Sequence, residues 1–179
     1  DRLNTLAELR HVLEQPLLGS ITRFAALGQR RPDLARVHPA LRYLHAPHSM
    51  EAENYRSLRS AINVVCDSSE QKIIQVSSPE PGDGKTTTVA NLALAAAQSG
   101  KKVLLIDADL RRPMLHTLFG LPADIGLAEV LTGELEFLNA IRPTAVEMLS
   151  VLPAGLPSTL AVPRDGKMRP SNNLIVVDL

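Results

Sequence analysis

Aromatic residues are scarce in this sequence: they make up 3% of its 179 residues, and tryptophan is absent. Proteins that bind single-stranded nucleic acid usually stack the bases on aromatic side chains, so the composition disfavours this class. The net charge is zero, with 19 basic and 19 acidic residues. Since no broad electrostatic field attracts polyanions, we expect no nucleic-acid partner.

Cysteine is nearly absent as well, because Cys66 is the single one. A disulfide within the chain is therefore impossible, and a reducing cytoplasm is the natural interpretation. The sequence has no run of about 18 apolar residues and no signal-peptide pattern, so we expect it to be soluble. With 45% apolar and 21% charged residues, it fits a soluble α/β protein with a real core.

The most informative stretch is SSPEPGDGKTTT at residues 77–88, which lies between an apolar strand-like run (72–76) and an Ala-rich helical run (89–98). Strand, glycine-rich turn and helix in this order predict a phosphate-binding P-loop. Glycines let backbone amides turn toward phosphate, and the helix N-terminus adds positive partial charge. We expect ATP or GTP to be held by Gly82, Asp83, Gly84, Lys85, Thr86 and Thr87. Pro79 departs from the usual pattern, which has glycine there.

Two further apolar runs end in aspartate, at residues 102–107 and 174–178. Parallel strands place their carboxyl ends at one edge of a sheet, where ligands bind, so these carboxylates should lie near the P-loop. Alone, Asp107 and Asp109 would more often belong to a turn or a helix cap. With a P-loop upstream, we expect Thr86, Asp107 and Asp178 to hold Mg²⁺. Asp109 or Asp107 would orient an attacking hydroxyl, and Arg111 would neutralise the transferring phosphoryl group.

A helix is expected from about residue 50 to 65, because Ser49 can cap it and Glu51 and Glu53 favour its first turn. Its helical spacing predicts a core-facing stripe of Ala52, Tyr55, Leu58, Ile62 and Val65. Beside this stripe lie Glu53, Arg56 and Arg59. On spacing alone, these three residues form a solvated face with a weak Glu53–Arg56 pair.

Together these motifs resemble the bacterial tyrosine kinases, the autokinase domains of capsule and exopolysaccharide machinery. The resemblance covers nearly the whole chain. It rests on the P-loop, on LIDADLR at 105–111, on Asp178 as the Walker B residue, on Glu-x-x-Arg-x-x-Arg at 53–59, and on RP at 112–113, LH at 115–116, FGLP at 119–122, GL at 126–127 and VLPAG at 151–155. It implies a P-loop NTPase-like, doubly wound and mostly parallel sheet with helices on both faces. It also implies ATP, Mg²⁺ and tyrosine autophosphorylation.

The resemblance also implies an organisation and partners. Residues 1–49 are similar to a juxtamembrane segment and linker, and residues 50–179 to the kinase domain. Glu53, Arg56 and Arg59 would join subunits in a ring-like homo-oligomer at the cytoplasmic face of the bacterial inner membrane. A transmembrane polysaccharide co-polymerase or activator segment and a tyrosine phosphatase would be partners. The stretch between residues 155 and 178 is shorter than in the family, and acceptor tyrosines are expected beyond residue 179.

Two alternatives remain open on the sequence. One is an ATPase assembly switch of the partition and septum-positioning type, without tyrosine phosphorylation. Those ATPases usually have lysine where this chain has Glu80, which disfavours them. The other is a nucleotide-binding module without catalysis, which the presence of Lys85, Thr86, Asp107 and Asp109 disfavours.

The remaining elements are predicted coarsely. We expect a helix beginning at Thr5, a short strand at 17–21 and a surface linker at 28–49. Downstream, we expect helices at 113–120, 127–131 and 134–141, and a strand at 147–152.

Overall fold

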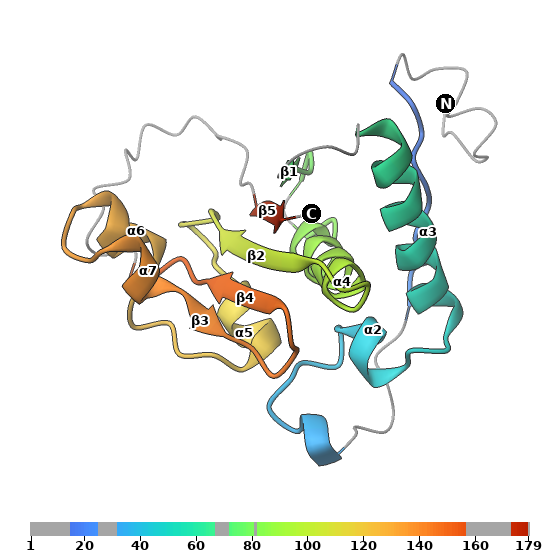
Figure 1. Cartoon of the computed structure of the whole chain (residues 1–179). Helices are drawn as coiled ribbons and strands as arrows, with labels where there is room; N and C mark the ends of the chain where they lie inside the picture. The colour runs from blue at the N-terminus through green and yellow to red at the C-terminus, as the bar shows by residue number, and fades with distance from the viewer. Residues whose placement is uncertain (1–14, 25–31, 67–71, 81, 157–172, 179) are drawn as a thin grey trace.

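A five-stranded mixed sheet forms the centre of the protein in the computed structural model, which describes residues 15–24, 32–66, 72–80, 82–156 and 173–178 (Figure 1). Across the sheet the strands follow the order β1-β5-β2-β4-β3. Their bounds are β1 Lys72–Val76, β2 Lys102–Asp107, β3 Arg142–Pro143, β4 Leu149–Leu152 and β5 Asn173–Asp178. β3 is a two-residue edge strand that the sequence did not predict, and it ends in a proline, a residue found mainly at sheet edges.

The strand directions define the edge that matters for function. β2 and β4 are parallel, whereas β5 is antiparallel to both β1 and β2, so β1, β2 and β4 run in one direction. Their carboxyl ends meet at one edge of the sheet, called the carboxyl edge below. The P-loop α/β class is confirmed, but the sheet is mixed rather than mostly parallel. The reason is that β4 ends and β5 begins at this same edge of the sheet. The chain therefore does not cross back to the opposite edge before β5, and β5 runs antiparallel to its neighbours.

Two long helices build the main layer beside the sheet. α4 (Lys85–Ala97) packs against β2, β4 and β5, and α3 (Met50–Val65) packs on α4 (Figure 1). The shorter helices are η1 Pro32–Leu34, α2 Arg42–His45, α5 Leu115–Phe119, α6 Leu127–Leu131 and α7 Phe137–Ala140. No helix within the described ranges is long and apolar enough to cross a bilayer.

The predicted start of α3 is confirmed, since the Ser49 hydroxyl accepts a hydrogen bond from the Ala52 amide at 3.2 Å. Such a cap contributes about 1 kcal/mol. Of the predicted core stripe, Ala52, Tyr55 and Ile62 are buried and Leu58 is partly buried. Val65 at the helix end is exposed, against the prediction.

The core is formed by every second side chain of β2 and by the small side chains of α4. Val103, Leu105 and Asp107 are buried, while the residues between them, Leu104 and Ile106, are half-buried. In α4 every residue from 89 to 97 is buried. Because alanine dominates this run, the helix can lie close to the strands on one side and to α3 on the other.

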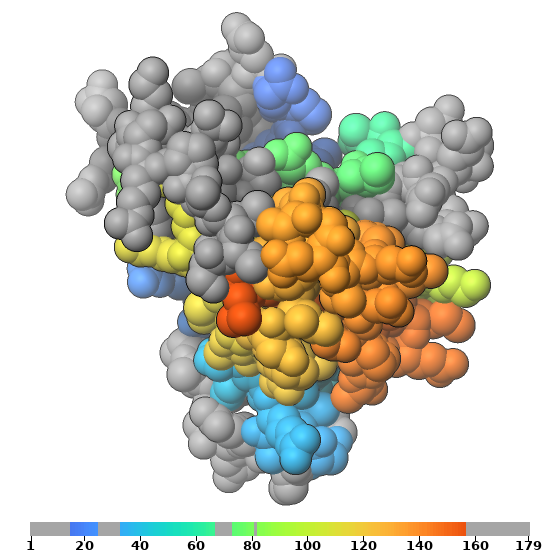
Figure 2. Space-filling view, turned by 90° about the vertical axis from the view of Figure 1, so that its left-hand side faces the viewer, coloured from blue at the N-terminus to red at the C-terminus, as the bar shows by residue number. Residues whose placement is uncertain are grey.

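Residues 37–45 belong to the core rather than to a surface linker. Val37, Leu41, Tyr43 and Leu44 are buried in the same apolar cluster as α4. In Figure 2 this segment (cyan) lies directly below α5 and the loop after it (yellow), and α6 and α7 (orange) lie above. The strand predicted at 17–21 is not formed, and the helix predicted from Thr5 lies outside the described residues.

Candidate functional site

The turn between β1 and α4 has the backbone that a phosphate cradle needs. Gly82 and Gly84 adopt φ angles of 94° and 90°, which side chains rarely tolerate. Gly84 is the N-cap residue of α4, and no side chain caps the helix there. A Cβ added at either glycine would meet no atom of the described structure within 4 Å. The turn therefore presents backbone and the N-terminus of a 13-residue helix to open space.

Side chains within the turn hold its shape. The Asp83 carboxylate accepts a hydrogen bond from the Glu80 amide at 3.0 Å, and the Ser78 hydroxyl donates to the Glu80 carbonyl at 3.0 Å. Asp83 itself is exposed. The Asp83 side chain thus stabilises the turn itself. We therefore expect Asp83 to bind phosphate through its backbone amide rather than through its side chain.

Lys85 connects the turn to the second acidic motif. It is the first residue of α4 and only 9% exposed. Its Nζ lies 3.2 Å from Oδ2 of Asp109, in the loop after β2, and both side chains are largely buried. A buried charge needs a partner, so this ion pair is the low-energy arrangement without a bound anion. Lys85 and Asp109 lie 24 residues apart in the sequence, and the fold brings them together at the carboxyl edge.

Asp107, the last residue of β2, is fully buried. Its Oδ2 accepts hydrogen bonds from the amides of Met114 and Leu115, both at 3.0 Å, and its Oδ1 accepts from the Asp109 amide at 3.2 Å. Burial raises the pKa of this carboxyl; the three amide bonds act in the opposite direction and the charge of Asp109 adds to the increase. Asp107 therefore fixes the loop after β2 and the start of α5, besides any metal it holds.

Asp109 and Arg111 occupy that loop. Oδ1 of Asp109 accepts a hydrogen bond from the Arg112 amide at 3.1 Å, while its Oδ2 faces Lys85. Arg111 is exposed. Thr86 and Thr87, in the first turn of α4, are half-buried at the same edge. The structure thus brings together all predicted P-loop residues and the second acidic motif.

Asp178 is a correction, because its predicted place at the carboxyl edge is wrong in this structure. β5 runs antiparallel to β2, so Asp178 pairs with Lys102 at the start of β2, whereas Asp107 pairs with Asn173. The two aspartates lie at opposite ends of the same strand pair. Asp178 is therefore not part of the site formed by Lys85, Asp107 and Asp109.

The Glu-x-x-Arg-x-x-Arg residues lie on α3, away from this edge, and make internal contacts. Arg56 pairs with Glu53 at 2.9 Å and donates to the Pro47 carbonyl at 2.7 Å. Arg59 donates to the Ala95 carbonyl at 2.9 Å, near the end of α4. The predicted Glu53–Arg56 pair is confirmed. A role of the three residues between subunits stays a prediction.

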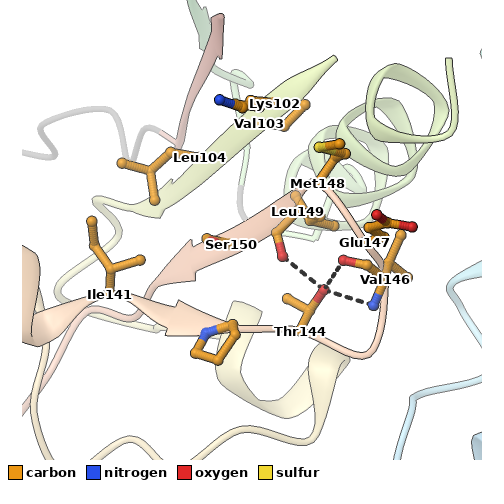
Figure 3. A pocket seen from close by; sticks show the side chains of 11 residues that line it. Lys102, Val103, Leu104, Ile141, Thr144, Val146, Glu147, Met148, Leu149 and Ser150 are labelled. Carbon is orange, nitrogen blue, oxygen red and sulfur yellow. Dashed lines mark hydrogen bonds between the residues drawn. The ribbon is translucent and has the colours of Figure 1, made fainter. Parts of the chain in front are cut away.

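A pocket of about 500 Å³ opens at the opposite edge of the sheet, where β2 and β4 begin (Figure 3). Leu104, Ile141 and Met148 line it, and Thr144 organises the adjoining turn through hydrogen bonds with Val146 and Leu149. It contains none of the predicted P-loop residues. Its position separates it from the residues at the carboxyl edge.

Sequence reasoning missed several buried polar residues, among them Asn91 and Glu129. Asn91 is the polar residue within the apolar run of α4, and Glu129 in α6 accepts hydrogen bonds from the amides of Gly126 and Leu156. A polar side chain inside an otherwise apolar helical run was the available signal for Asn91. Within the described residues, no cluster of three or more histidine, cysteine or carboxylate side chains forms a ready metal site.

Comparisons with known proteins agree with this geometry. A family model described as AAA domain matches residues 71–161. The chain is 43% identical over 109 residues to the tyrosine-protein kinase YwqD of Bacillus subtilis, a match that covers 61% of this chain and 46% of YwqD. It is 38% identical over 110 residues to the succinoglycan biosynthesis transport protein ExoP of Rhizobium meliloti, covering 62% of this chain and 14% of ExoP.

Among solved structures, the chain is similar to the chimerical protein CapA2B2. The TM-score is 0.71 at 34% sequence identity, and the match covers 89% of this chain and 66% of that one. The chain thus spans about half the length of YwqD and a small part of ExoP.

Proposed function

We propose, on the premise that this chain belongs to the AAA domain family and within it to the bacterial tyrosine kinases, that it is the nucleotide-binding part of an ATP-dependent protein-tyrosine autokinase. The autokinase would regulate capsular or exopolysaccharide synthesis and export through cyclic oligomerisation. ExoP is a succinoglycan biosynthesis transport protein, and the similarity to it supports the polysaccharide role.

The contact between Lys85 and Asp109 carries this proposal. It joins the P-loop to the strand-end acidic motif within 3.2 Å, at the edge where β1, β2 and β4 end. Phosphoryl transfer needs positioned charges more than covalent chemistry, and a lysine beside a carboxylate supplies both signs. When phosphate arrives, Lys85 would exchange its carboxylate partner for the phosphate oxygens. Asp109 would then be released to act on the acceptor.

The residues of the turn fit ATP and Mg²⁺. The backbone from Gly82 to Gly84 and the uncapped start of α4 favour an anion, and no described residue fills the space in front of both glycines. Lys85, Thr86 and Thr87 would bind the phosphates, and Thr86 with Asp107 would hold the metal. Bound Mg²⁺ would neutralise charge on the β- and γ-phosphates.

The other charged residues would serve the acceptor side. The released Asp109 carboxylate would accept the proton of a tyrosine hydroxyl while that oxygen bonds to the γ-phosphorus and the bond from phosphorus to ADP breaks. Arg111, exposed in the same loop, would neutralise the transferring phosphoryl group. Asp107 would keep the loop in register through its three amide bonds.

The acceptor tyrosine would come from another polypeptide segment. The sequence contains two tyrosines, and both are buried: Tyr55 is 1% exposed and Tyr43 is 3% exposed. Both side chains are packed in the apolar core, so neither is presented to solvent as an acceptor. A neighbouring subunit in a ring-like homo-oligomer would present the acceptor, with Glu53, Arg56 and Arg59 at the contact.

The family supports proposals for the remaining partners and for the location. We place the protein at the cytoplasmic face of the bacterial inner membrane, with a transmembrane co-polymerase or activator segment and a tyrosine phosphatase as partners. Multiple phosphates on neighbouring chains would add like charge and weaken the ring.

Transfer of labelled phosphate from Mg-ATP to a Glu/Tyr copolymer tests the proposal. Lys85→Met should reduce labelling at least a hundredfold, because the charge that faces the phosphates is lost. Lys102→Met is the matched control: it removes the same charge from an exposed lysine at the opposite edge, and it should label like the parent. Undiminished labelling by Lys85→Met would refute the site.

The same assay separates the alternative function. If the parent chain hydrolyses Mg-ATP but never labels tyrosine, even with an activator segment present, an ATPase assembly switch becomes the better description. Calorimetry provides the more basic check, because absence of heat with any magnesium nucleotide would exclude both functions.

The ring contact has its own test. Arg56→Ala combined with Arg59→Ala should lower the oligomer mass in light scattering while Mg-ATP still binds. Arg23→Ala combined with Arg36→Ala, two exposed arginines outside α3, is the matched control and should leave the mass unchanged. An unchanged mass in the α3 double variant would exclude the interface.

A further inference from the structure

Asn91 is a fully buried amide in the middle of the apolar run of α4. Its side chain connects the helix to a distant segment. Nδ2 donates to the Ala40 carbonyl at 3.0 Å, and Oδ1 accepts from the Tyr43 amide at 3.0 Å. Nδ2 also donates to the Thr87 carbonyl at 2.9 Å, one turn earlier in α4. Both ends of the amide are therefore matched to one arrangement of residues 37–49, called the docking segment below.

Asn91 lies in the same rigid element as the P-loop residues. α4 begins at Lys85, and the Thr87 carbonyl that Asn91 contacts belongs to its first turn. If the docking segment left, the amide of Asn91 would lose two partners in a buried site. Helix α2 of this segment also packs against α4, so without the segment α4 would lose a packing partner and would be free to move. Such a movement would displace the turn that holds phosphate.

Helix α3 reinforces the same junction. The Tyr55 side chain is buried at this junction, where Thr88 and Asn91 lower its pKa against the effect of burial. The Arg56 guanidinium lies 5.0 Å from the centre of the Tyr43 ring and donates to the Pro47 carbonyl. The docking segment is thus held from two helices, by polar contacts on α4 and by a cation–π contact on α3.

The docking segment also contacts the other half of the site. The His38 amide donates to the Leu118 carbonyl of α5 at 2.9 Å. The start of α5 is itself held by Asp107, through the amides of Met114 and Leu115. The docking segment therefore contacts both helices next to the site. Helix α4 begins with Lys85, and the loop that contains Asp109 leads into α5.

We propose that Asn91 is a positioning residue that couples docking of residues 37–49 to the geometry of the phosphate-binding turn. The docked segment keeps α4 and α5 in register and so raises the affinity for Mg-ATP. Because coupling is reciprocal, bound nucleotide strengthens docking by the same factor. The affinity effect rests on the proposed function, whereas the coupling between the segment and α4 does not.

Native-state amide exchange on the parent chain without ligand tests the coupling directly. The Tyr43 amide is bonded to Asn91, and the Thr88 amide is bonded to the Gly84 carbonyl in the first turn of α4. We expect both amides to exchange through one opening, with the same dependence on denaturant. Exchange of the Tyr43 amide through a separate, lower-energy opening would overturn the proposal.

Variants and Mg-ATP give the second arm. Asn91→Asp keeps the shape but loses the two bonds that Nδ2 donates, and it should weaken Mg-ATP binding in calorimetry about tenfold, a typical coupling. Leu92→Ala, a buried neighbour on the same helix, is the control for lost stability and should bind Mg-ATP like the parent. Equal affinities for parent and Asn91→Asp would overturn the proposal.

Bound Mg-ATP should also slow exchange of the Tyr43 amide in the parent chain. The factor by which exchange slows should equal the factor by which Asn91→Asp weakens Mg-ATP binding. Unchanged exchange at saturating Mg-ATP would overturn the coupling. If the parent bound no nucleotide, the proposed function would fail, and the ligand-free exchange would still decide whether the segment and α4 are coupled.

Discussion

Replacing Asp107 tests whether its carboxylate has a structural role or serves only to bind a metal. Asp107→Asn keeps the shape but offers one acceptor oxygen instead of two. If that oxygen serves the amides of Met114 and Leu115, the new NH₂ group faces the buried Asp109 amide. One lost buried bond costs about 1–3 kcal/mol of unfolding free energy. Asp107→Ala leaves all three amides without this acceptor and should cost about 3–9 kcal/mol, at about 1–3 kcal/mol each.

The pH dependence of that loss has a definite sign. Burial raises the pKa of Asp107 in the folded chain above its ordinary value of 3.8. Its contribution to stability is therefore fully present below 3.8 and declines as the pH rises through the raised folded pKa. The penalty of Asp107→Asn should be larger at about pH 4 than at about pH 7. Asp124→Asn, at an exposed carboxyl, is the matched control for the substitution itself.

Urea unfolding of the parent and both asparagine variants at the two pH values measures these differences. Metal-dependent transfer to the Glu/Tyr copolymer is assayed in parallel and should be lost in Asp107→Asn. A full loss of transfer with no loss of stability would refute the structural role derived from the three amide bonds. A stability penalty that grows with pH would refute the raised pKa and would mean that the three amide bonds outweigh burial.

Two further predictions concern the scaffold. Gly133→Ala, at a φ of 77° with open space around the missing Cβ, should cost about 1 kcal/mol in urea unfolding. Gly120→Ala, at a φ of 64° with a backbone carbonyl in the way, should cost about 2 kcal/mol more, and equal losses would contradict the predicted clash. Burial raises the pKa of Tyr55 from 10.0 to about 12, against the hydrogen bonds that lower it. Stability from this tyrosine should thus persist below pH 10 and fall by about 1.4 kcal/mol per pH unit above it. Tyr55→Phe should lack that slope in alkaline urea unfolding, and an identical slope would exclude Tyr55 as its source.

Local patterns made several elements predictable from the sequence. Ser49 and the apolar spacing after it predicted α3 from residue 50 to 65, because caps and helical periodicity act within a few residues. The P-loop was predictable for the same reason, since glycines, lysine and threonines in a fixed order serve one backbone geometry. Burial of Tyr55 also followed from spacing alone.

Short elements and long-range partners were not predictable. α2 has four residues, too few to nucleate a helix by propensity, and it forms where Leu41 and Tyr43 are buried. Likewise, Asn91 binds backbone atoms 48 and 51 residues away. A sequence pattern carries no information about a backbone partner at that distance.

The sequence by itself determined that a P-loop precedes an acidic strand end, since residue order and local spacing encode both. Tertiary structure decided that Lys85 pairs with Asp109, that Asp107 serves three backbone amides, and that Asp178 lies at the far edge of the sheet. The last point has a simple physical reason. An apolar strand has the same alternation in either direction, so only the packing of β5 between β1 and β2 selects which of its ends meets the site.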